Sequence, residues 1–138
     1  MSNLSATLEN IKNIKIDPYT YTVEKGKIKE FASAIGDEKE EYMHGEIIPP
    51  TFPTVIEFWG GKSSSSEMLG LNMSKVLHGE QAFEYLDDIK IGDEITVNSM
   101  VEDVYTKASM NFIVLKKEFV NQNNETVLIS RSTIIERH

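Results

Sequence analysis

The sequence predicts an α+β domain in which a long antiparallel β-sheet wraps around one central α-helix. An unusually apolar helical segment follows Pro53, and four strand-rich segments fill the second half of the chain. A helix that is apolar on most sides has to be buried on most sides. Long antiparallel strands offer one apolar face for that burial. A sheet packed around the helix buries both elements.

The four strand-rich segments contain many Val, Ile, Thr, Phe and Tyr residues, which are typical of strands. Residues 121–124 (Asn-Gln-Asn-Asn) form a turn signal between the last two segments, so these are expected to form an antiparallel hairpin. In the second segment Ile95, Val97, Val101 and Tyr105 are expected to share one face. The predicted strands are residues 76–86, 94–106, 109–120 and 126–137.

The first half of the chain is predicted to contain a helix over residues 24–35. Thr22, at the end of a short strand over residues 19–23, is in position to cap this helix, and Gly36 is in position to end it. An apolar stripe at helical spacing is expected to face the core. It consists of Ile28, Phe31, Ala32 and Ile35.

The domain is expected to span residues 17–138, after an N-terminal arm or short helix over residues 1–16. Asp17-Pro18 separates the two, because a proline disfavours helical backbone in the residue before it. Farther along, Pro49 and Pro50 favour an extended approach to the central helix, and Pro53 suits its first turn. The apolar residues of that helix are Val55, Ile56, Phe58 and Trp59.

Composition excludes several classes of function. The chain of 138 residues has no cysteine, so neither a disulfide framework nor a thiolate metal site is possible. Its three histidines lack the spacing of a metal site, and no glycine pattern for a nucleotide cofactor is present, so no metal and no cofactor are expected. A net charge of −8 disfavours nucleic-acid binding. No apolar stretch is long enough to cross a bilayer and no secretory signal is evident, which predicts a cytoplasmic protein.

Five short motifs occur in an order that resembles the N-terminal-type domain of MaoC-like hydratases and dehydratases. The resemblance covers residues 17–137 and is close to the hot-dog subunits of (3R)-hydroxyacyl-ACP dehydratases. It implies a hot-dog fold, an acyl-CoA or acyl-carrier-protein thioester as ligand, and a homodimer or a heterodimer with a homologous hot-dog subunit. The motifs are FASAIGD (31–37), PPTFP (49–53), LHGEQAFEY (77–85), IKIGDEITV (89–97) and VYTKASMNFIV (104–114).

The resemblance also implies a catalytic pair. The catalytic subunits of the family carry an Asp and, five residues later, a His, which together add or remove water across a double bond beside the thioester. The Asp position matches Asp37, but Tyr42 stands at the His position. A tyrosine is a poor proton shuttle near neutral pH. His44, two residues on, either replaces the missing histidine or is a surface residue.

Further residues are candidates for binding the substrate, each with a structural alternative. Phe52, Phe58 and Trp59 could border an acyl channel or simply belong to the core. His78 could line the site or the dimer seam, or could be a structural histidine. The substrate-binding set implied by the resemblance is Tyr42, Pro50, Thr51, Phe52, Phe58, Trp59 and His78.

Three functions are compatible with these residues. The chain could belong to a hydro-lyase that interconverts (3R)-hydroxyacyl and trans-2-enoyl thioesters, acting alone or with a catalytic partner. It could instead be a non-catalytic acyl-binding subunit beside a homologue with an intact Asp–His pair, which is the reading that Tyr42 favours. A hot-dog thioesterase would need a carboxylate on the central helix, where Glu57 is the acidic residue.

Overall fold

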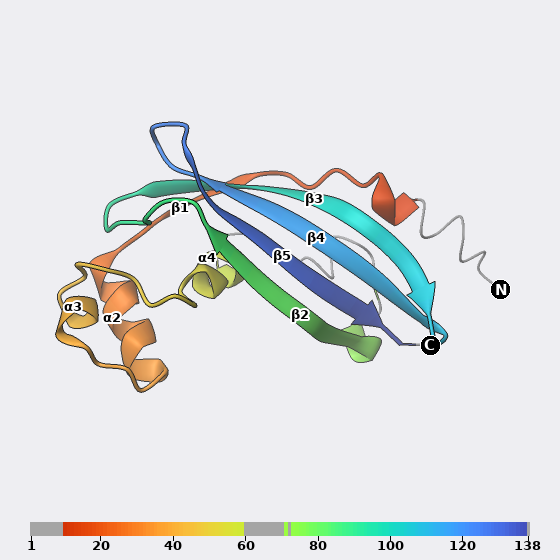
Figure 1. Ribbon diagram of the computed structural model, residues 1–138, viewed down its shortest axis with the longest axis horizontal. Helices are drawn as coiled ribbons and strands as arrows, with labels where there is room; N and C mark the ends of the chain where they lie inside the picture. The colour runs from red at the N-terminus through yellow and green to blue at the C-terminus, as the bar shows by residue number, and fades with distance from the viewer. Residues whose placement is uncertain (1–9, 60–70, 72, 138) are drawn as a thin grey trace.

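The computed structural model describes residues 10–59, 71 and 73–137 and confirms a long antiparallel sheet over a central helix. Five strands form one sheet in the order β1-β3-β4-β5-β2, and every neighbouring pair is antiparallel (Figure 1). The predicted hairpin of the last two strands is present. The strands are β1 (Tyr19–Thr22), β2 (Val76–Tyr85), β3 (Glu94–Lys107), β4 (Met110–Val120) and β5 (Thr126–Glu136).

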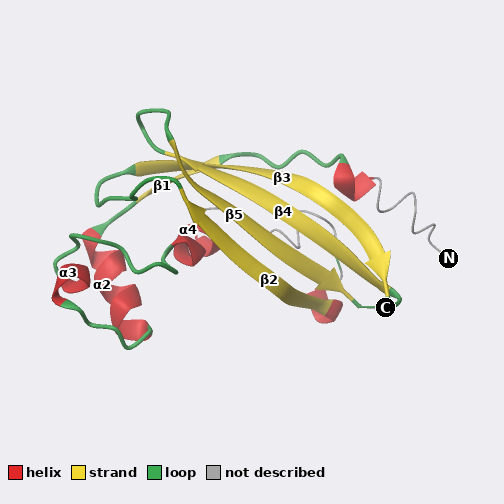
Figure 2. Ribbon diagram, in the orientation of Figure 1, coloured by secondary structure: helices red, strands yellow, loops and turns green. Residues whose placement is uncertain are grey.

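The helices lie at both ends of the sheet and against one of its faces (Figure 2). Helices α2 and α3 pack on each other at the end near β1, and α4 lies under the sheet. Within the described residues, no helix is long and apolar enough to cross a membrane. The helices are α2 (Lys25–Ala34), α3 (Glu40–Met43), α4 (Pro53–Trp59) and the 3-10 helix η1 (Met73–Lys75).

Helix α2 matches the prediction in its body but not at its start. Thr22 belongs to strand β1, and Glu24 is the residue before the first turn, with no side-chain cap. The capping role predicted for Thr22 is therefore wrong, because pairing with β3 holds that residue in the sheet. Gly36 ends the helix in the left-handed conformation, with φ 73°. Ile35 lies beyond the last turn and is 48% exposed, so it leaves the predicted apolar stripe.

Helix α4 begins at Pro53, as the sequence predicts, and covers one end of the inner face of the sheet. Val55 and Ile56 are buried, but Phe58 is 72% exposed, so the helix is not buried on all sides. The side chain of Trp59 lies outside the described residues. The core cluster around α4 consists of Val23, Ile28, Phe52, Val55, Ile56, Ile89, Ile95, Val97, Phe119, Val127 and Leu128.

A second core cluster lies at the other end of the same face. It includes Ile11 from a helical turn over residues 10–12, which is 5% exposed. Residues 1–9 of the predicted arm lie outside the described residues. The cluster consists of Ile11, Leu71, Val101, Ile113, Leu115 and Ile134.

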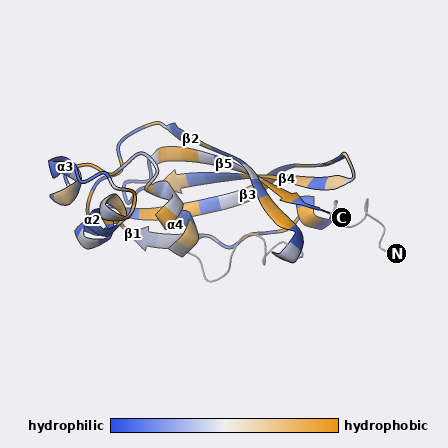
Figure 3. Ribbon diagram, turned by 90° about the horizontal axis from the view of Figure 1, so that it is seen from below, coloured by the Kyte–Doolittle hydropathy of each residue, from blue (hydrophilic) through white to orange (hydrophobic). Residues whose placement is uncertain are grey.

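A polar row separates the two clusters. Ser99, Lys117 and Ser130 are cross-strand partners on β3, β4 and β5. Glu57 of α4 lies over this row, where its Oε1 accepts a hydrogen bond of 2.7 Å from Ser130 and lies 3.6 Å from the Nζ of Lys117. Figure 3 shows hydrophobic and hydrophilic stretches alternating along the strands of the sheet. We call these four residues, together with Gln81, which donates to Ser130, the polar band.

Strand β3 departs from the predicted alternation at a bulge. Its register with β4 shifts between Val101 and Asp103. One extra residue moves the following side chains to the opposite face. Val104 therefore packs on the second cluster, whereas Tyr105 is 40% exposed and stacks on Phe112 with ring centroids 4.9 Å apart. The expectation that Tyr105 shares the buried face is wrong for this reason.

The buried ion pair gives a test of how α4 is held. Lys117→Met removes the ammonium beside a carboxylate whose side chain is only 10% exposed. We expect the free energy of unfolding to fall by about 3 kcal/mol, because a buried charge loses its counterion. Adding Glu57→Gln removes that charge and should restore part of the loss. Urea denaturation measures the two single variants and the double variant.

Lys116→Met is the matched control, because Lys116 pairs with Glu118, whose side chain is 44% exposed. This change should lower the free energy of unfolding by at most about 1 kcal/mol. A double variant that loses as much stability as the two single changes combined would show that the ion pair does not couple α4 to the sheet.

Candidate functional site

A cavity of about 340 Å³ lies where two loops meet the end of β2. One wall comes from the segment that leads from α3 to α4, and the other from the segment between β2 and β3. The volume is within the range of small-molecule sites, which begins at roughly 300 Å³. Its floor is apolar and its rim carries charge. The lining residues are Glu46, Ile47, Ile48, Pro50, Tyr85, Asp88, Ile89 and Lys90.

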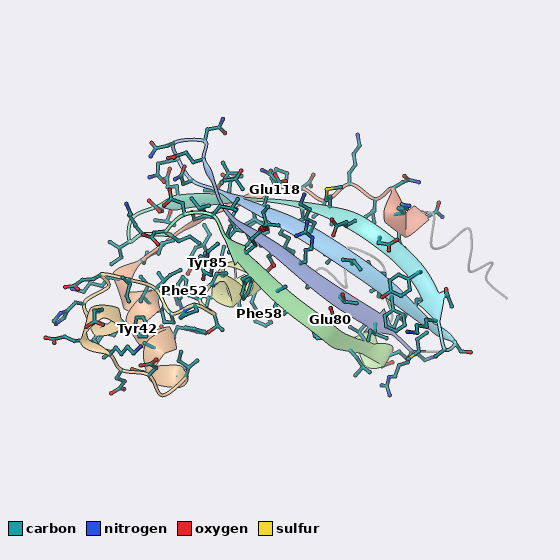
Figure 4. All side chains as sticks on the ribbon, viewed as in Figure 1. Tyr42, Phe52, Phe58, Glu80, Tyr85 and Glu118 are labelled. Atoms are coloured by element: carbon teal, nitrogen blue, oxygen red, sulfur yellow. The ribbon has the colours of Figure 1, made fainter. Side chains whose placement is uncertain are left out.

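Tyr85 closes one side of this cavity and fixes the proline-rich segment. Its hydroxyl donates a hydrogen bond of 2.6 Å to the carbonyl oxygen of Pro50. Partial burial, with a smaller contribution from nearby Tyr42, raises the pKa of Tyr85 to about 12. The phenol is therefore neutral at physiological pH and remains a hydrogen-bond donor. Figure 4 shows Tyr42, Phe52 and Tyr85 on the side of the molecule where α2 and α3 lie.

Gly45 lies directly before residues 46–50, which form one wall of the cavity. It is buried with φ 72°, a conformation that other residues rarely adopt. A Cβ atom at this position would collide with the side chain of Ile91. The close approach of the two segments holds residues 46–50 against residues 88–91.

The opposite wall is held by Asp93. This carboxylate is 8% exposed and accepts hydrogen bonds from the backbone N–H of Lys90, at 2.8 Å, and from the side chain of Gln122, at 3.1 Å. Gly92, with φ 84°, donates its N–H to Val23 across the turn. These contacts fix the turn that carries Ile89 and Lys90 to the cavity.

The predicted catalytic residues are not joined to each other. Asp37 is half-buried after the end of α2, where its N–H donates to the carbonyl of Ala32. His44 is exposed at the end of α3. Among the described residues, no hydrogen bond or ion pair links Asp37 to His44. Tyr42, at the position where the resemblance implies a histidine, is 5% exposed and has the Nζ of Lys39 5.5 Å from its ring centroid.

The predicted binding residues separate into three groups. Pro50 lines the cavity, and Thr51 is exposed beside it. Phe52 is fully buried and packs edge-to-face on Phe31, with centroids 5.7 Å apart, so it supports the core under the site. His78 lies near the opposite end of β2, where it pairs with Ile134, a member of the second core cluster.

Seven of the eight residues that line the cavity were not predicted from the sequence, Tyr85 and Ile89 among them. Tyr85 and Ile89 stand in motifs that support the resemblance, but nothing in their spacing indicates that they face Pro50. Only the pairing of β2 with β5 and the turn at Gly92 bring them there. The only local indication in the sequence was that Tyr85 and Ile89 lie at, and shortly after, the end of a predicted strand.

Glu57 does not have the surroundings of a catalytic acid. Its side chain is 10% exposed and is occupied by Ser130 and Lys117. Its backbone carbonyl accepts a hydrogen bond of 3.4 Å from Tyr19, whose pKa is raised by burial and by the charge of Glu57. In residues 10–59, 71 and 73–137, no three His, Cys, Asp or Glu side chains gather as metal ligands would.

A sequence profile of the family described as "FAS1-like, dehydratase domain region" matches residues 11–130. The chain belongs to this family. It is 33% identical over 132 residues to a UPF0336 protein of Streptomyces avermitilis, covering 88% of this chain and 87% of that one. A UPF0336 protein of Streptomyces coelicolor is 32% identical over 128 residues, covering 85% of each chain.

Solved structures show the same fold. A MaoC-like dehydratase from Phytophthora capsici superposes with a TM-score of 0.79 at 22% identity, over 94% of this chain and 48% of that one. The ChsH1–ChsH2 complex of Mycobacterium tuberculosis gives 0.76 at 18%, over 98% and 93%. The HadBC (3R-hydroxyacyl-ACP dehydratase) complex of the same organism gives 0.73 at 15%, over 89% and 97%. The MaoC-like hot-dog fold predicted from the motifs is thus confirmed.

The hydrogen bond from Tyr85 to Pro50 gives a test of how the wall of the cavity is held. Tyr85→Phe removes the bond to Pro50, and we expect the free energy of unfolding to fall by about 1 kcal/mol. Because the pKa of Tyr85 is raised from 10.0 to about 12, this contribution is complete below pH 10 and is lost as the pH rises through 12. Urea denaturation at neutral and alkaline pH should show the difference between the two proteins shrinking.

Tyr105→Phe is the control, because Tyr105 is equally exposed and its ring keeps its stacking on Phe112. An equal loss in both variants would mean that the bond to Pro50 contributes nothing specific.

Proposed function

We propose that this chain is the acyl-thioester-binding subunit of a hydratase or dehydratase that interconverts (3R)-hydroxyacyl and trans-2-enoyl thioesters. In this proposal a homologous hot-dog chain supplies the catalytic Asp–His pair. Family membership supports the reaction class. The buried Tyr42 at the position of the missing histidine is the observation that carries the division of roles.

The reaction needs two proton transfers that this site does not provide by itself. In the hydration direction, a base takes a proton from water while the oxygen adds to C3, and an acid protonates C2. A carboxylate and a histidine must both reach the reacting atoms. No hydrogen bond or ion pair joins Asp37 to His44 among the described residues; the first is half-buried after α2 and the second is exposed after α3. Tyr42 is buried, and the ammonium group of Lys39 lies over its ring.

The cavity supports a binding role. Ile48, Pro50 and Ile89 give an apolar surface for an acyl group, and Tyr85 gives a neutral polar group beside them. Burying methylene groups there favours binding by about 0.8 kcal/mol each. Such a site binds an acyl thioester through its tail and leaves the chemistry to the partner.

An open sheet edge supports a partner chain. In the described part of the molecule, no strand pairs with the outer edge of β2. The strand is ten residues long and contains neither lysine nor proline, which commonly protect such edges. Two of the structural neighbours are complexes named for two different chains, HadBC and ChsH1–ChsH2.

The thioesterase alternative has less support. It requires a carboxylate on the central helix that is directed at the thioester carbonyl. The Glu57 carboxylate is instead directed at Ser130 and Lys117 on the sheet. A non-catalytic acyl-binding protein that acts without any hydratase partner uses the same cavity, and the activity test below separates it from the proposed function.

The proposal is tested by assaying the chain alone and with a co-expressed homologous hot-dog chain that carries an Asp–x4–His motif. Alone, the protein should hydrate crotonyl-CoA at or near the background rate. The complex should be active, and Asp37→Asn or His44→Ala in this chain should change its rate less than twofold. Replacing the partner's motif aspartate should lower the rate by roughly 10² to 10⁴, the usual contribution of an acid or base.

A high rate for the isolated chain that Asp37→Asn abolishes would overturn the division of roles. Binding of acyl-CoA without activity in any complex would favour the non-catalytic alternative. Size-exclusion chromatography of the mixed chains confirms that the complex is the species assayed.

A further inference from the structure

The polar band crosses the buried face of the sheet, between the two apolar core clusters. Along β3 the inner side chains change from Val97 to Ser99 to Val101. The same change from apolar to polar and back occurs along β4 at Lys117 and along β5 at Ser130 and Ser132. The two core clusters are therefore separate, and the band lies between them.

The band is built from well-satisfied groups. Ser130 is 1% exposed and donates to Glu57, while it accepts a hydrogen bond of 2.8 Å from Gln81. The side chains of Glu57 and Lys117 are 10% and 9% exposed. No buried side-chain polar atom among the described residues lacks a partner. A group that displaces these contacts has to desolvate a charged pair and break its hydrogen bonds.

The cavity and the band lie on the same apolar cluster. Ile89 lines the cavity and belongs to the cluster, and Ile48 lines the cavity and packs against it. Tyr85 of the cavity pairs with Leu128, and Ser130 follows two residues later along β5. At about 3.4 Å per residue, the band begins roughly 7 Å beyond the row that closes the cavity.

We propose that the polar band sets the length of acyl chain that this protein accepts, with Glu57, Lys117 and Ser130 as the specificity-determining residues. This rests on the proposed function. The acyl tail enters through the cavity and gains apolar contact with the first cluster. It stops at the band, because further methylene groups would meet a hydrogen-bonded ion pair instead of apolar side chains. The substrates are therefore short- to medium-chain thioesters.

The test measures binding of saturated acyl-CoAs from butyryl to palmitoyl by calorimetry, with the full chain and with its complex. In the wild type, each added methylene should improve Kd about fourfold until the tail reaches the band. The Kd should then reach a plateau or worsen before palmitoyl. A continuous improvement up to palmitoyl would overturn the proposal.

Glu57→Leu with Lys117→Met replaces the ion pair by apolar side chains of similar size, a change that folded proteins often tolerate. In this variant the improvement should continue past the wild-type plateau, by at least tenfold for the longest chains. Ser130→Ala is the milder second variant and should move the plateau in the same direction. Lys116→Met, on the neighbouring position of β4, should bind all chain lengths as the wild type does.

An unchanged plateau in both folded band variants would show that another feature limits the chain length. The absence of binding at every chain length, in the chain and in the complex, would overturn the proposed function as well. Binding without a plateau overturns only the role of the band, so the two failures are distinguishable.

Discussion

The contact between helix α4 and the inner face of the sheet determines where the other parts of the site lie. A helix of seven residues is too short to be stable alone, so its position comes from its contacts. Phe52 and Ile56 are fully buried on the sheet, and Glu57 is tied to β4 and β5 through Lys117 and Ser130. Because the helix is held in this way, the segment before it has to arrive beside β2. That arrival brings Pro50 within hydrogen-bonding distance of Tyr85 and creates the cavity.

The sequence predicts features that depend on a few neighbouring residues. Pro53 begins α4, Gly36 ends α2, and the asparagine-rich turn joins β4 to β5, since each depends on local backbone preferences. Errors arise where a distant contact decides. Thr22 is held by its pairing with β3 instead of capping a helix, and the bulge after Val101 turns Tyr105 to the outer face. The alternation of apolar and polar residues indicates a strand, but it does not show where a bulge inserts an extra residue.

The same limit applies to the site. Lys116 and Lys117 are adjacent on a strand, so one of them must face inwards, and the strand pattern does not reveal the partner of that lysine. The partner is Glu57, on a helix far away in the chain, which lies over Lys117. Tyr42 is different, because the motif spacing alone marks it as the residue in place of a histidine. The structure adds that this tyrosine is buried, with 5% of its surface exposed.

Within the described residues, the outer edge of β2 is unpaired and lies beside the cavity. Tyr85 is the last residue of β2 and also a wall of the cavity. A second chain that pairs with this edge would therefore lie beside the cavity, and residues from its own loops would face the bound thioester. Gln81, on the same strand, belongs to the polar band. One strand thus touches the cavity, the band and the edge, so a chain bound there would change both where the acyl group lies and which groups act on it. In the proposed function, this arrangement would let a subunit that lacks the catalytic histidine select the substrate of the complex.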